Sequence, residues 1–400
     1  MNIEVNRHYI LEAAKIASKV APSAAYSDVI NGILVEGNSD TGELYLTATN
    51  HSISIQMKVM ATVHESGSML INARLLADMM SKLDTDFITM SANKPQLLNV
   101  IGGRCRYQIN CLSSEHYPKP IIPFPEESVI MSGICSLAKR TTFAVSKSDN
   151  IPELQCVQVK LKNNAVQAAA CDGMRMMLTK DAAGTPDERE FLLPGSSLHL
   201  LASISKDDDV FEVGSIGNQV VFVRGDMIFT INKLSTGEFI DINNLLQKVE
   251  AVYTAVADAG KLKEAFELLA IGAAIGGKHN PINLAMADGE ISMNCNHEYS
   301  EASTSVTANV INGTPDTGFH YDVSALVKLF RVVGGTVKIE IDANGFMMIK
   351  TRTEVYLQRP MRTPAPIAQD KAKNSSQSEQ KDKKKEAKRA KGTKDVKEAA

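Results

Sequence analysis

The chain has 400 residues, 44% of them hydrophobic and 22% charged, which is typical of a globular protein of two or three domains. No apolar run approaches the ~18 residues of a membrane span and no signal peptide follows Met1, so we expect a cytoplasmic protein without membrane contacts. The net charge is −3, but residues 364–400 hold 11 Lys and Arg against 6 Asp and Glu, so a body of net charge −8 carries a tail of net charge +5.

Periodicity in the first part of the chain predicts two halves, each a helix followed by strands. An apolar stripe at helical spacing runs from Ile10 to Ala17, and a second stripe from Leu76 to Leu83 predicts a helix over 73–82. Alternating apolar residues and turn signals predict the strands. These strands cover 32–36, 43–49, 52–60, 69–71, 87–92, 97–101 and 104–111.

Two features of this segment recur later in the chain, nearly in step. A polar residue that we expect to end a strand occurs three times, at spacings of 122 and 124 residues: Asn50, Asp172 and Asn296. The second helical stripe also occurs three times, at spacings of 122 and 128 residues, with equivalent leucines Leu76, Leu198 and Leu326. Two repeats in step indicate three copies of one domain, and their period is too long for a solenoid.

We therefore predict an α+β fold of three tandem domains, each made of two helix-plus-antiparallel-sheet half-units. Prolines near Pro125 and a break near Val249 place the domains at 1–124, 125–248 and 249–363. Residues 364–400 lack apolar periodicity and are predicted to form a disordered basic tail. Its charge fits either a nucleic-acid tether or a solubilising extension.

The sequence lacks the motifs of the common enzyme classes. Gly276-Gly277-Lys278 misses the first glycine and the final Ser or Thr of a phosphate-binding loop, and His64-Glu65 and His297-Glu298 have no second metal ligand at i+4. Cys171 and Asp172 are adjacent on a strand and would point to opposite faces. The six cysteines form no C-x-x-C pair, which favours reduced buried thiols. We expect no catalytic residue, no metal and no cofactor.

Three short motifs, in this order along the chain, resemble one family. They are Asp172-Gly173-Met174-Arg175, Gly237-Glu238-Phe239-Ile240-Asp241 and Tyr356-Leu357-Gln358-Arg359-Pro360-Met361-Arg362. The family versions are D-G-H-R, G-x-F-P-D and Y-V-V-M-P-M-R-L, so Met174, Ile240, Gln358 and Arg359 are departures. Together with the length and the repeat, these motifs resemble the bacterial β sliding clamp, the processivity subunit of the replicative DNA polymerase.

The resemblance implies that three DNA-clamp domains per chain form a closed six-domain ring as a homodimer, joined head to tail around duplex DNA without reading its sequence. It also implies three kinds of partner: the DNA polymerase catalytic subunit, an ATP-driven clamp loader and other clamp-binding peptides. An acidic body is compatible with such a ring if the inner wall is basic. The alternatives are an enzyme built from repeats, and a clamp-like scaffold that does not encircle DNA and uses the tail as its tether.

Basic residues on the predicted helices, with Lys147 in the loop beyond one of them, are the candidates for contacts with DNA in the lumen of the ring. The alternative for any one of them is an ordinary solvated surface charge. The set is Lys15, Lys19, Arg74, Lys82, Lys139, Arg140, Lys147, Lys206, Lys328 and Arg331.

The edges of the first and third domains are the candidates for the dimer interface. Alternation places Cys105, Tyr107 and Ile109 on one face of the strand over 104–111, and positions in the third domain resemble the interface of the family. Otherwise this is an ordinary edge strand with solvated arginines. The set is Arg104, Arg106, Tyr107, Ile109, Leu268, Ile271, Glu298 and Glu301.

A pocket between the second and third domains is the candidate site for partner peptides. An apolar hollow with a few polar groups suits a short peptide with aliphatic and aromatic anchors, and methionines allow it to repack. The alternative is an interdomain core. The set is Leu154, Gly173, Met174, Arg175, Met176, Ile240, Leu245, Phe346, Leu357, Pro360, Met361 and Arg362.

Overall fold

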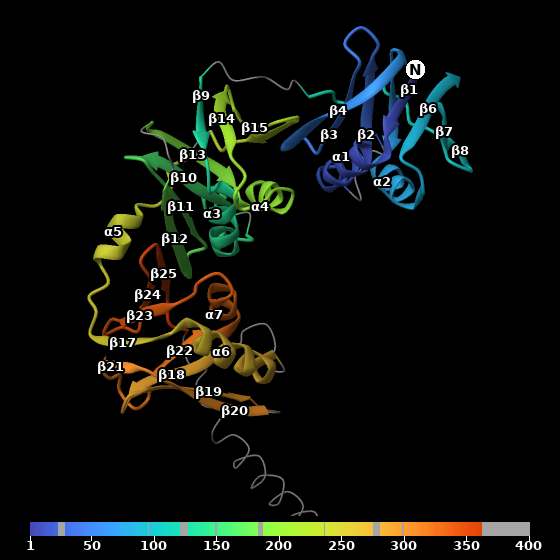
Figure 1. Cartoon of the computed structure of the whole chain (residues 1–400). Coiled ribbons are helices and arrows are strands. Elements are labelled where there is room, and N and C mark those ends of the chain that lie inside the picture. Colours follow the sequence, from blue (N-terminus) through green and yellow to red (C-terminus); the bar gives the residue numbers. More distant parts are fainter. Residues whose placement is uncertain are drawn as a thin grey trace, which may run out of the picture.

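The computed structural model describes residues 1–22, 29–94, 96–120, 127–148, 150–182, 187–235, 237–274, 281–297 and 300–361. These residues form three α+β units along an arc (Figure 1). We call them unit one (2–110), unit two (128–232) and unit three (253–358). Arg362 and the predicted tail lie outside the described residues.

Unit one repeats the same order of elements in its two halves. Its second half matches the prediction closely, with a helix at Ala73–Lys82, whereas the short first strand was not predicted. The elements are β1 (Asn2–Asn6), α1 (Arg7–Val20), β2 (Gly32–Asn38), β3 (Glu43–Thr49), β4 (Ile53–Glu65), β5 (Gly67–Asn72), α2 (Ala73–Lys82), β6 (Phe87–Lys94), β7 (Leu97–Gly102) and β8 (Cys105–Asn110).

Unit two follows the same order and is connected to unit three by a short helix. Its elements are β9 (Ser128–Met131), α3 (Ile134–Thr141), the 3-10 turns η1 (Thr142–Ala144) and η2 (Pro152–Gln155), β10 (Cys156–Lys162), β11 (Ala165–Cys171), β12 (Arg175–Ala182), β13 (Arg189–Pro194), α4 (Gly195–Ser203), β14 (Phe211–Ile216), β15 (Gln219–Arg224) and β16 (Met227–Asn232). The connecting helix is α5 (Ile242–Gln247).

Unit three has one extra short strand, β21, between its halves. Its elements are β17 (Tyr253–Asp258), α6 (Ala259–Ala273), β18 (Pro281–Ala287), β19 (Glu290–His297), β20 (Ser300–Thr307), β21 (Asn309–Asn312), β22 (Phe319–Asp322), α7 (Val323–Phe330), β23 (Thr336–Ile341), β24 (Met347–Lys350) and β25 (Glu354–Gln358). The prediction for Asn296 was wrong by one residue, because β19 includes Asn296 and ends at His297.

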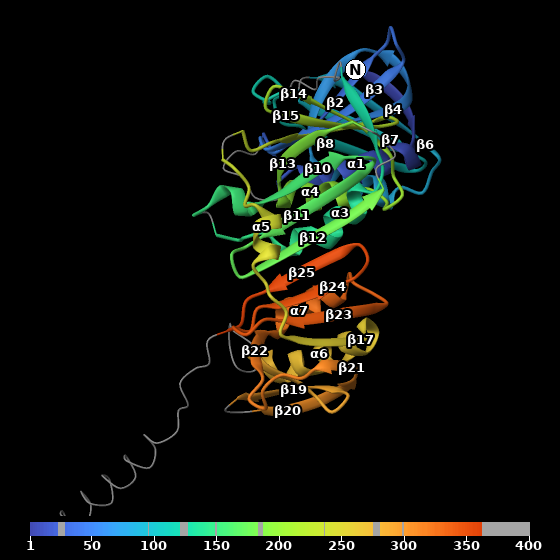
Figure 2. The same ribbon diagram turned by 90° about the vertical axis from the view of Figure 1, so that its left-hand side faces the viewer.

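The helices pack in pairs on one side of the sheets. In each unit the two long helices contact each other: α1 with α2, α3 with α4 and α6 with α7. Their apolar stripes are buried against the strands, as at Ile10 and Leu326, and side chains such as Asn72 and Asp258 cap their first turns. The helices line the concave side of the arc, and the sheets lie on the convex side (Figures 1 and 2).

Sheets run continuously from one unit into the next. At junction one, β4 of unit one pairs with β16 of unit two, which joins their strands in a 12-stranded sheet. At junction two, β12 of unit two pairs with β25 of unit three in a 9-stranded sheet. Among the described residues, all of the pairings between strands are antiparallel. Two edge strands, β8 and β20, lie in units one and three at the two ends of the arc (Figure 1).

Candidate functional site

The two junctions use the same strand register. At junction one, Ile53, Ile55 and Met57 lie opposite Ile231, Phe229 and Met227. At junction two, Arg175, Met177 and Thr179 lie opposite Gln358, Tyr356 and Glu354. In both cases the last strand of a first half pairs with the last strand of a second half. The hairpins that lead into β4 and β12 have the same length, because Ile53 and Arg175 both begin their strands after two-residue turns.

Strands β20 and β8 are equivalent to the strands that pair at the two junctions, but they lie unpaired at opposite ends of the chain. Ser300 begins β20 directly opposite His297, as Ile53 and Arg175 begin β4 and β12. On the other side, Cys105 pairs with Gly102 across a two-residue turn, as Met227 pairs with Arg224. Strand β8 is therefore equivalent to β16 and β25, and β20 is equivalent to β4 and β12.

An aromatic residue occupies the same place in all three second-half strands. Phe229 and Tyr356 lie at the junctions and have no exposed surface, whereas the equivalent Tyr107 on β8 is 39% exposed. Tyr107 and Ile109 lie opposite the buried Val100 and Leu98, so both belong to the helix side of the sheet. Tyr107 is thus an aromatic side chain in a junction position that this chain leaves uncovered.

The predicted interface residues of α6 also occupy a junction position. Leu268 lies ten residues after the N-cap Asp258, just as Phe143 lies ten residues after the N-cap Gly133. Phe143 stacks on Tyr356 across junction two, with ring centroids 6.4 Å apart. Leu268 is 53% exposed and Ile271 is 72% exposed.

Polar members of the predicted interface lie on the same two edges. Glu301 is exposed on β20, Arg106 is exposed on β8, and Arg104 is exposed in the turn before β8. Glu298 lies outside the described residues.

Most of the predicted lumen residues lie on the concave, helix-bearing side. Lys19 Nζ donates to the carbonyl oxygen of Ser203 at 2.9 Å, which connects α1 with α4 across junction one. Lys139 pairs with Asp207 at 2.7 Å, Lys15 pairs with Glu12 at 3.1 Å, and Arg331 lies 3.9 Å from Glu267. These are exposed or half-exposed pairs, which water and phosphate can replace at little cost. Three further members are exposed on helices or the loops after them: Arg74, Lys82 and Lys206.

Several cations converge beside junction two. Burial lowers the pKa of the Lys328 ammonium, repulsion from Arg175, Lys147 and Arg331 lowers it further, and Asp322 opposes the shift. The guanidinium of Arg175 is itself paired with Asp172, with Nε and Oδ2 2.9 Å apart. Lys328 on α7 is therefore near enough to these three cations to be repelled by them.

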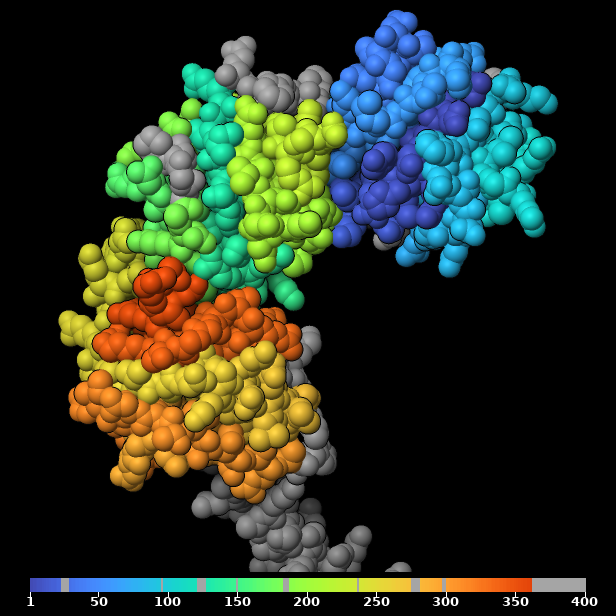
Figure 3. All heavy atoms as spheres, in the orientation of Figure 1, coloured from blue at the N-terminus to red at the C-terminus, as the bar shows by residue number. Residues whose placement is uncertain are grey.

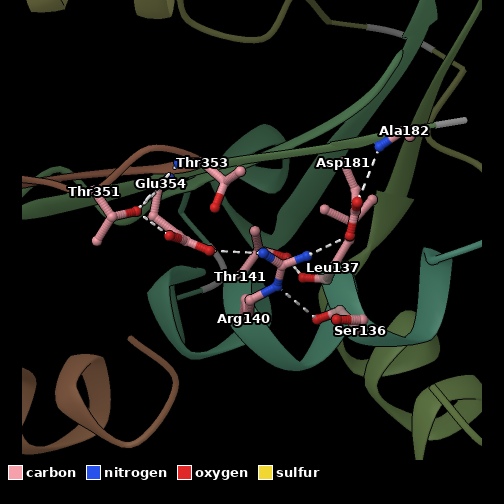
Figure 4. Close-up of polar contacts among 9 residues, drawn as sticks. All are labelled: Ser136, Leu137, Arg140, Thr141, Asp181, Ala182, Thr351, Thr353 and Glu354. Atoms are coloured by element: carbon pink, nitrogen blue, oxygen red, sulfur yellow. Dashed lines mark hydrogen bonds and ion pairs between the residues drawn. The ribbon is translucent and has the colours of Figure 1, made fainter. Parts of the chain in front are cut away.

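Arg140 differs from the other predicted lumen residues. Its guanidinium bridges units two and three, 2.7 Å from the Glu354 carboxylate on β25 and 3.1 Å from Asp181 on β12 (Figure 4). Its side chain is 14% exposed. Glu354 also accepts a hydrogen bond from Thr351. The sequence could not show that Arg140 faces two carboxylates, one of them 214 residues away, and we withdraw it from the proposed DNA contacts.

The predicted partner pocket forms a small apolar cluster that is separate from the main core. Leu154, Met176, Ile240, Phe346 and Leu357 all belong to it. Sequence reasoning missed further members of this cluster, among them Ala169, Cys171, Leu178, Phe239, Ile242 and Met348. The alternation of β12 and the Phe239-containing motif were the signals that could have identified them.

The polar rim of this cluster combines the ends of β12 and β25. Asp172 caps the turn by accepting from the backbone N–H groups of Met174 and Arg175, and Met174 is 51% exposed. Arg359 donates its backbone N–H to Met174, and its guanidinium lies 5.7 Å from the centre of the Phe346 ring. The substituted Arg359 thus covers part of this rim.

The remaining predicted pocket residues lie around this rim. Met361 donates its N–H to His320 at 2.7 Å. Gly173 is exposed, Pro360 and Met361 are partly exposed, and Leu245 lies partly exposed on α5.

Unit one fills the equivalent place with one of its own side chains. Tyr117, in the segment that leaves unit one, is 6% exposed, packs with Leu34 and Leu70, and donates its hydroxyl to the Thr47 carbonyl. In unit two the connecting segment contributes Phe239 and Ile240 at the edge of the cluster instead. The apolar cluster beside junction two therefore differs in composition from its counterpart in unit one.

Within the described residues, no helix is long and apolar enough to cross a membrane. No group of three or more His, Cys, Asp or Glu side chains is placed to bind a metal ion in the same residues.

Comparisons with known proteins extend over almost the whole described chain. Residues 1–121 match the family model of the DNA polymerase III beta subunit N-terminal domain, and residues 130–241 match that of its central domain. The beta sliding clamp of Pseudomonas aeruginosa is 26% identical over 379 residues, covering 90% of this chain and 100% of the relative, and that of Bacillus subtilis is 22% identical over 386 residues, covering 91% and 100%. The crystal structure of the DNA polymerase sliding clamp from Bacillus subtilis superimposes with a TM-score of 0.80 at 19% identity, over 91% of this chain and 100% of that one.

Proposed function

Because the chain belongs to the DNA polymerase III beta subunit family, we propose that it is a sliding clamp, a ring of two chains that encircles duplex DNA and holds the replicative polymerase on it. The proposal includes the predicted domain limits of 1–124, 125–248 and 249–363. The clamp is not an enzyme: it acts by topology, since a closed ring can slide along DNA but cannot dissociate sideways.

The observation that carries this proposal is the repeated junction. Each chain contains two copies of one strand pairing and leaves the third pair, β20 and β8, at opposite ends of an open arc (Figure 3). If β20 of one chain pairs with β8 of another in the same register, two chains close a ring with two-fold symmetry. Ser300, Ala302 and Thr304 then lie opposite Ile109, Tyr107 and Cys105 of the second chain.

This arrangement buries apolar side chains that are exposed in the single chain. Tyr107 becomes an interface residue equivalent to Phe229 and Tyr356, and Leu268 covers it as Phe143 covers Tyr356. On the outer face, Glu301 comes within diagonal reach of Arg106, where an opposite-charge pair adds a small stabilisation. The predicted ion pairs thus surround an apolar centre.

The concave side then forms the lumen. The remaining cations of the predicted set lie on or beside its helices and contact phosphates without reading bases. Exposed pairs such as Lys139 with Asp207 exchange readily for phosphate contacts. Such weak contacts allow sliding, whereas a tight network of direct contacts would hinder it.

The apolar cluster beside junction two is the proposed docking site for the polymerase, for an ATP-driven loader and for other clamp-binding peptides. Leu154, Met176 and Leu357 offer an apolar surface. Arg175, whose guanidinium pairs with Asp172, and Arg362 remain the predicted polar groups. Arg359 lies over Phe346 at its rim, so we expect this clamp to prefer peptides that tolerate a cation there.

Retention on circular DNA tests this function. The protein, loaded onto nicked circular duplex by a clamp loader, should elute with the DNA after a high-salt wash and should be released when a restriction enzyme linearises the circle. A variant with Lys15, Lys19 and Lys82 changed to Gln should load less well and show a flatter salt dependence. Equal retention on linear and circular DNA would contradict encirclement.

A further inference from the structure

A hollow on the convex face of unit two adjoins the apolar cluster of the proposed partner pocket. Its volume is about 660 Å³, and it lies between the strands β10 to β12 and the connecting segment Phe239–Asn243. Lys160, Lys162 and Lys180 line it. Ile240 and Ile242 line it too, and both pack in the apolar cluster of the partner pocket. The two sites therefore share a wall.

The charge of this hollow distinguishes it from its counterpart on unit one. That counterpart, of about 550 Å³, lies over β2 to β5 and is lined by one lysine and one glutamate, Lys119 and Glu36, which pair at 2.7 Å. The hollow on unit two is lined by three lysines and only one carboxylate, that of Asp241. The two hollows thus lie over equivalent sheets but differ in charge, on a body that is acidic overall.

The lysines of the hollow are available to an anionic ligand, because the ion pairs that two of them make are exposed. Lys160 lies 3.4 Å from Glu190 and Lys162 lies 3.3 Å from Glu188, in pairs whose side chains are all more than 40% exposed. Such pairs contribute little and exchange easily. Among the residues that the structure describes, Lys180 has no carboxylate within ion-pair distance, and its side chain is exposed.

We propose that this hollow binds acidic residues that flank the anchor residues of a partner peptide. The inference rests on the proposed partner pocket, because a peptide that leaves that pocket across Ile240 and Ile242 arrives at the three lysines. The basic tail of this chain is excluded as an occupant by its charge of +5. Acidic flanks raise affinity here through long-range attraction and exposed ion pairs, so their contribution depends on salt.

The test uses the full-length dimer and three fluorescent peptides with the same leucine–phenylalanine anchors. One peptide has serines on both sides, one has three aspartates before the anchors, and one has them after. At low salt, one acidic peptide should bind about tenfold more tightly than the serine peptide, as three exposed ion pairs allow. High salt should remove this difference.

The variant Lys160→Gln/Lys162→Gln/Lys180→Gln should lose the tenfold gain and bind the serine peptide as before. The matched control Lys94→Gln/Lys119→Gln/Lys261→Gln removes the same charge elsewhere and should keep the gain. A gain that survives in the first variant, or that disappears equally in both, would overturn the inference.

Three further outcomes separate this inference from related proposals. If none of the three peptides binds, the assignment of the partner pocket is wrong, and the inference that depends on it is wrong too. If the serine peptide binds but neither acidic peptide gains, only the hollow is wrong. If the three lysines affect a single-stranded oligothymidine and not the acidic peptides, the hollow is a nucleic-acid site and the proposal is also wrong.

Discussion

Junction one and junction two share their strand register but not their chemistry. At junction one, Ile55 and Met57 of β4 face Phe229 and Met227, and all four side chains are apolar. At junction two, the equivalents of Met57 and Met227 are Thr179 and Glu354. The backbone pairing defines the architecture, and the side chains can therefore vary from apolar packing to an ion pair.

The helices that cover the two junctions also differ in chemistry. Arg140 lies seven residues after the N-cap of α3, and the residue at that distance from the N-cap of α1 is Ala13. Ala13 is 2% exposed in the apolar core, whereas the Arg140 side chain bridges two carboxylates (Figure 4). Junction two, beside which the partner pocket lies, is thus the polar one.

The largest effect is expected at the third junction, which two chains form. Tyr107→Ala with Ile271→Asp removes the apolar centre twice in a two-fold ring and places a carboxylate in it. The protein should sediment as a monomer at concentrations where the wild type is a dimer. Its thermal unfolding at low concentration should change little, because Tyr107 is 39% exposed in the single chain. A stable dimer in this variant would exclude β8 and α6 from the interface.

The next largest effect is expected at junction one. Phe229→Ala empties a fully buried aromatic position and should lower the free energy of unfolding by about 3–5 kcal/mol. Tyr107→Ala is the matched control, since it truncates the equivalent residue at a free edge and should cost much less in the monomer. Denaturant titration of both variants measures the difference, and equal losses would contradict the equivalence of these positions.

A smaller effect is expected at junction two. Arg140→Ala leaves Glu354 without its cation and should cost roughly 2–3 kcal/mol, because a poorly exposed carboxylate loses its partner. The double variant Arg140→Ala/Glu354→Met installs the residues of junction one and should recover most of that loss. Failure of the second substitution to rescue the first would show that the bridge is not exchangeable for apolar packing.

The smallest expected effect is on how the stability of the protein depends on pH. Burial raises the pKa of Glu354, but hydrogen bonds from Thr351 and Arg140 outweigh it, so the net pKa is below the ordinary value of 4.5. A lowered folded-state pKa stabilises the protein above pH 4.5, and this contribution is lost as the pH falls through the folded-state value. Below pH 4.5, Glu354→Gln should therefore lose less stability per pH unit than the wild type. If the stabilities of the variant and the wild type fall in parallel as the pH is lowered, the lowered pKa of Glu354 is contradicted.

The sequence predicted the fold better than the roles of individual charges. The periodicity of a helix or a strand depends only on residues close together in the sequence. The sequence therefore predicted the helix at Ala73–Lys82 and the common face of Tyr107 and Ile109. The prediction for the third repeat is wrong by one residue, because the polar Asn296 lies inside β19 and does not end it. Strand β1 was missed because five residues give too little periodicity.

Charges could not be assigned because their partners are distant in sequence. Lys139 and Arg140 are neighbours on α3, yet Lys139 pairs with an exposed carboxylate of unit two and Arg140 joins units two and three. The hollow over β10 to β12 was missed for a similar reason, since its lysines come from two strands and its wall from the segment that follows β16.

The central claim is that two chains pair through β20 and β8 in the register of the two internal junctions, and a single cysteine tests it. That register places Thr304 opposite the native Cys105 of the second chain, as Met57 lies opposite Met227. Opposed residues of an antiparallel pair lie within disulfide range. Thr304→Cys should therefore form a covalent dimer under mild oxidation, whereas Ser305→Cys, which points to the other face, should not. A dimer that forms with Ser305→Cys, or with neither variant, would contradict the account.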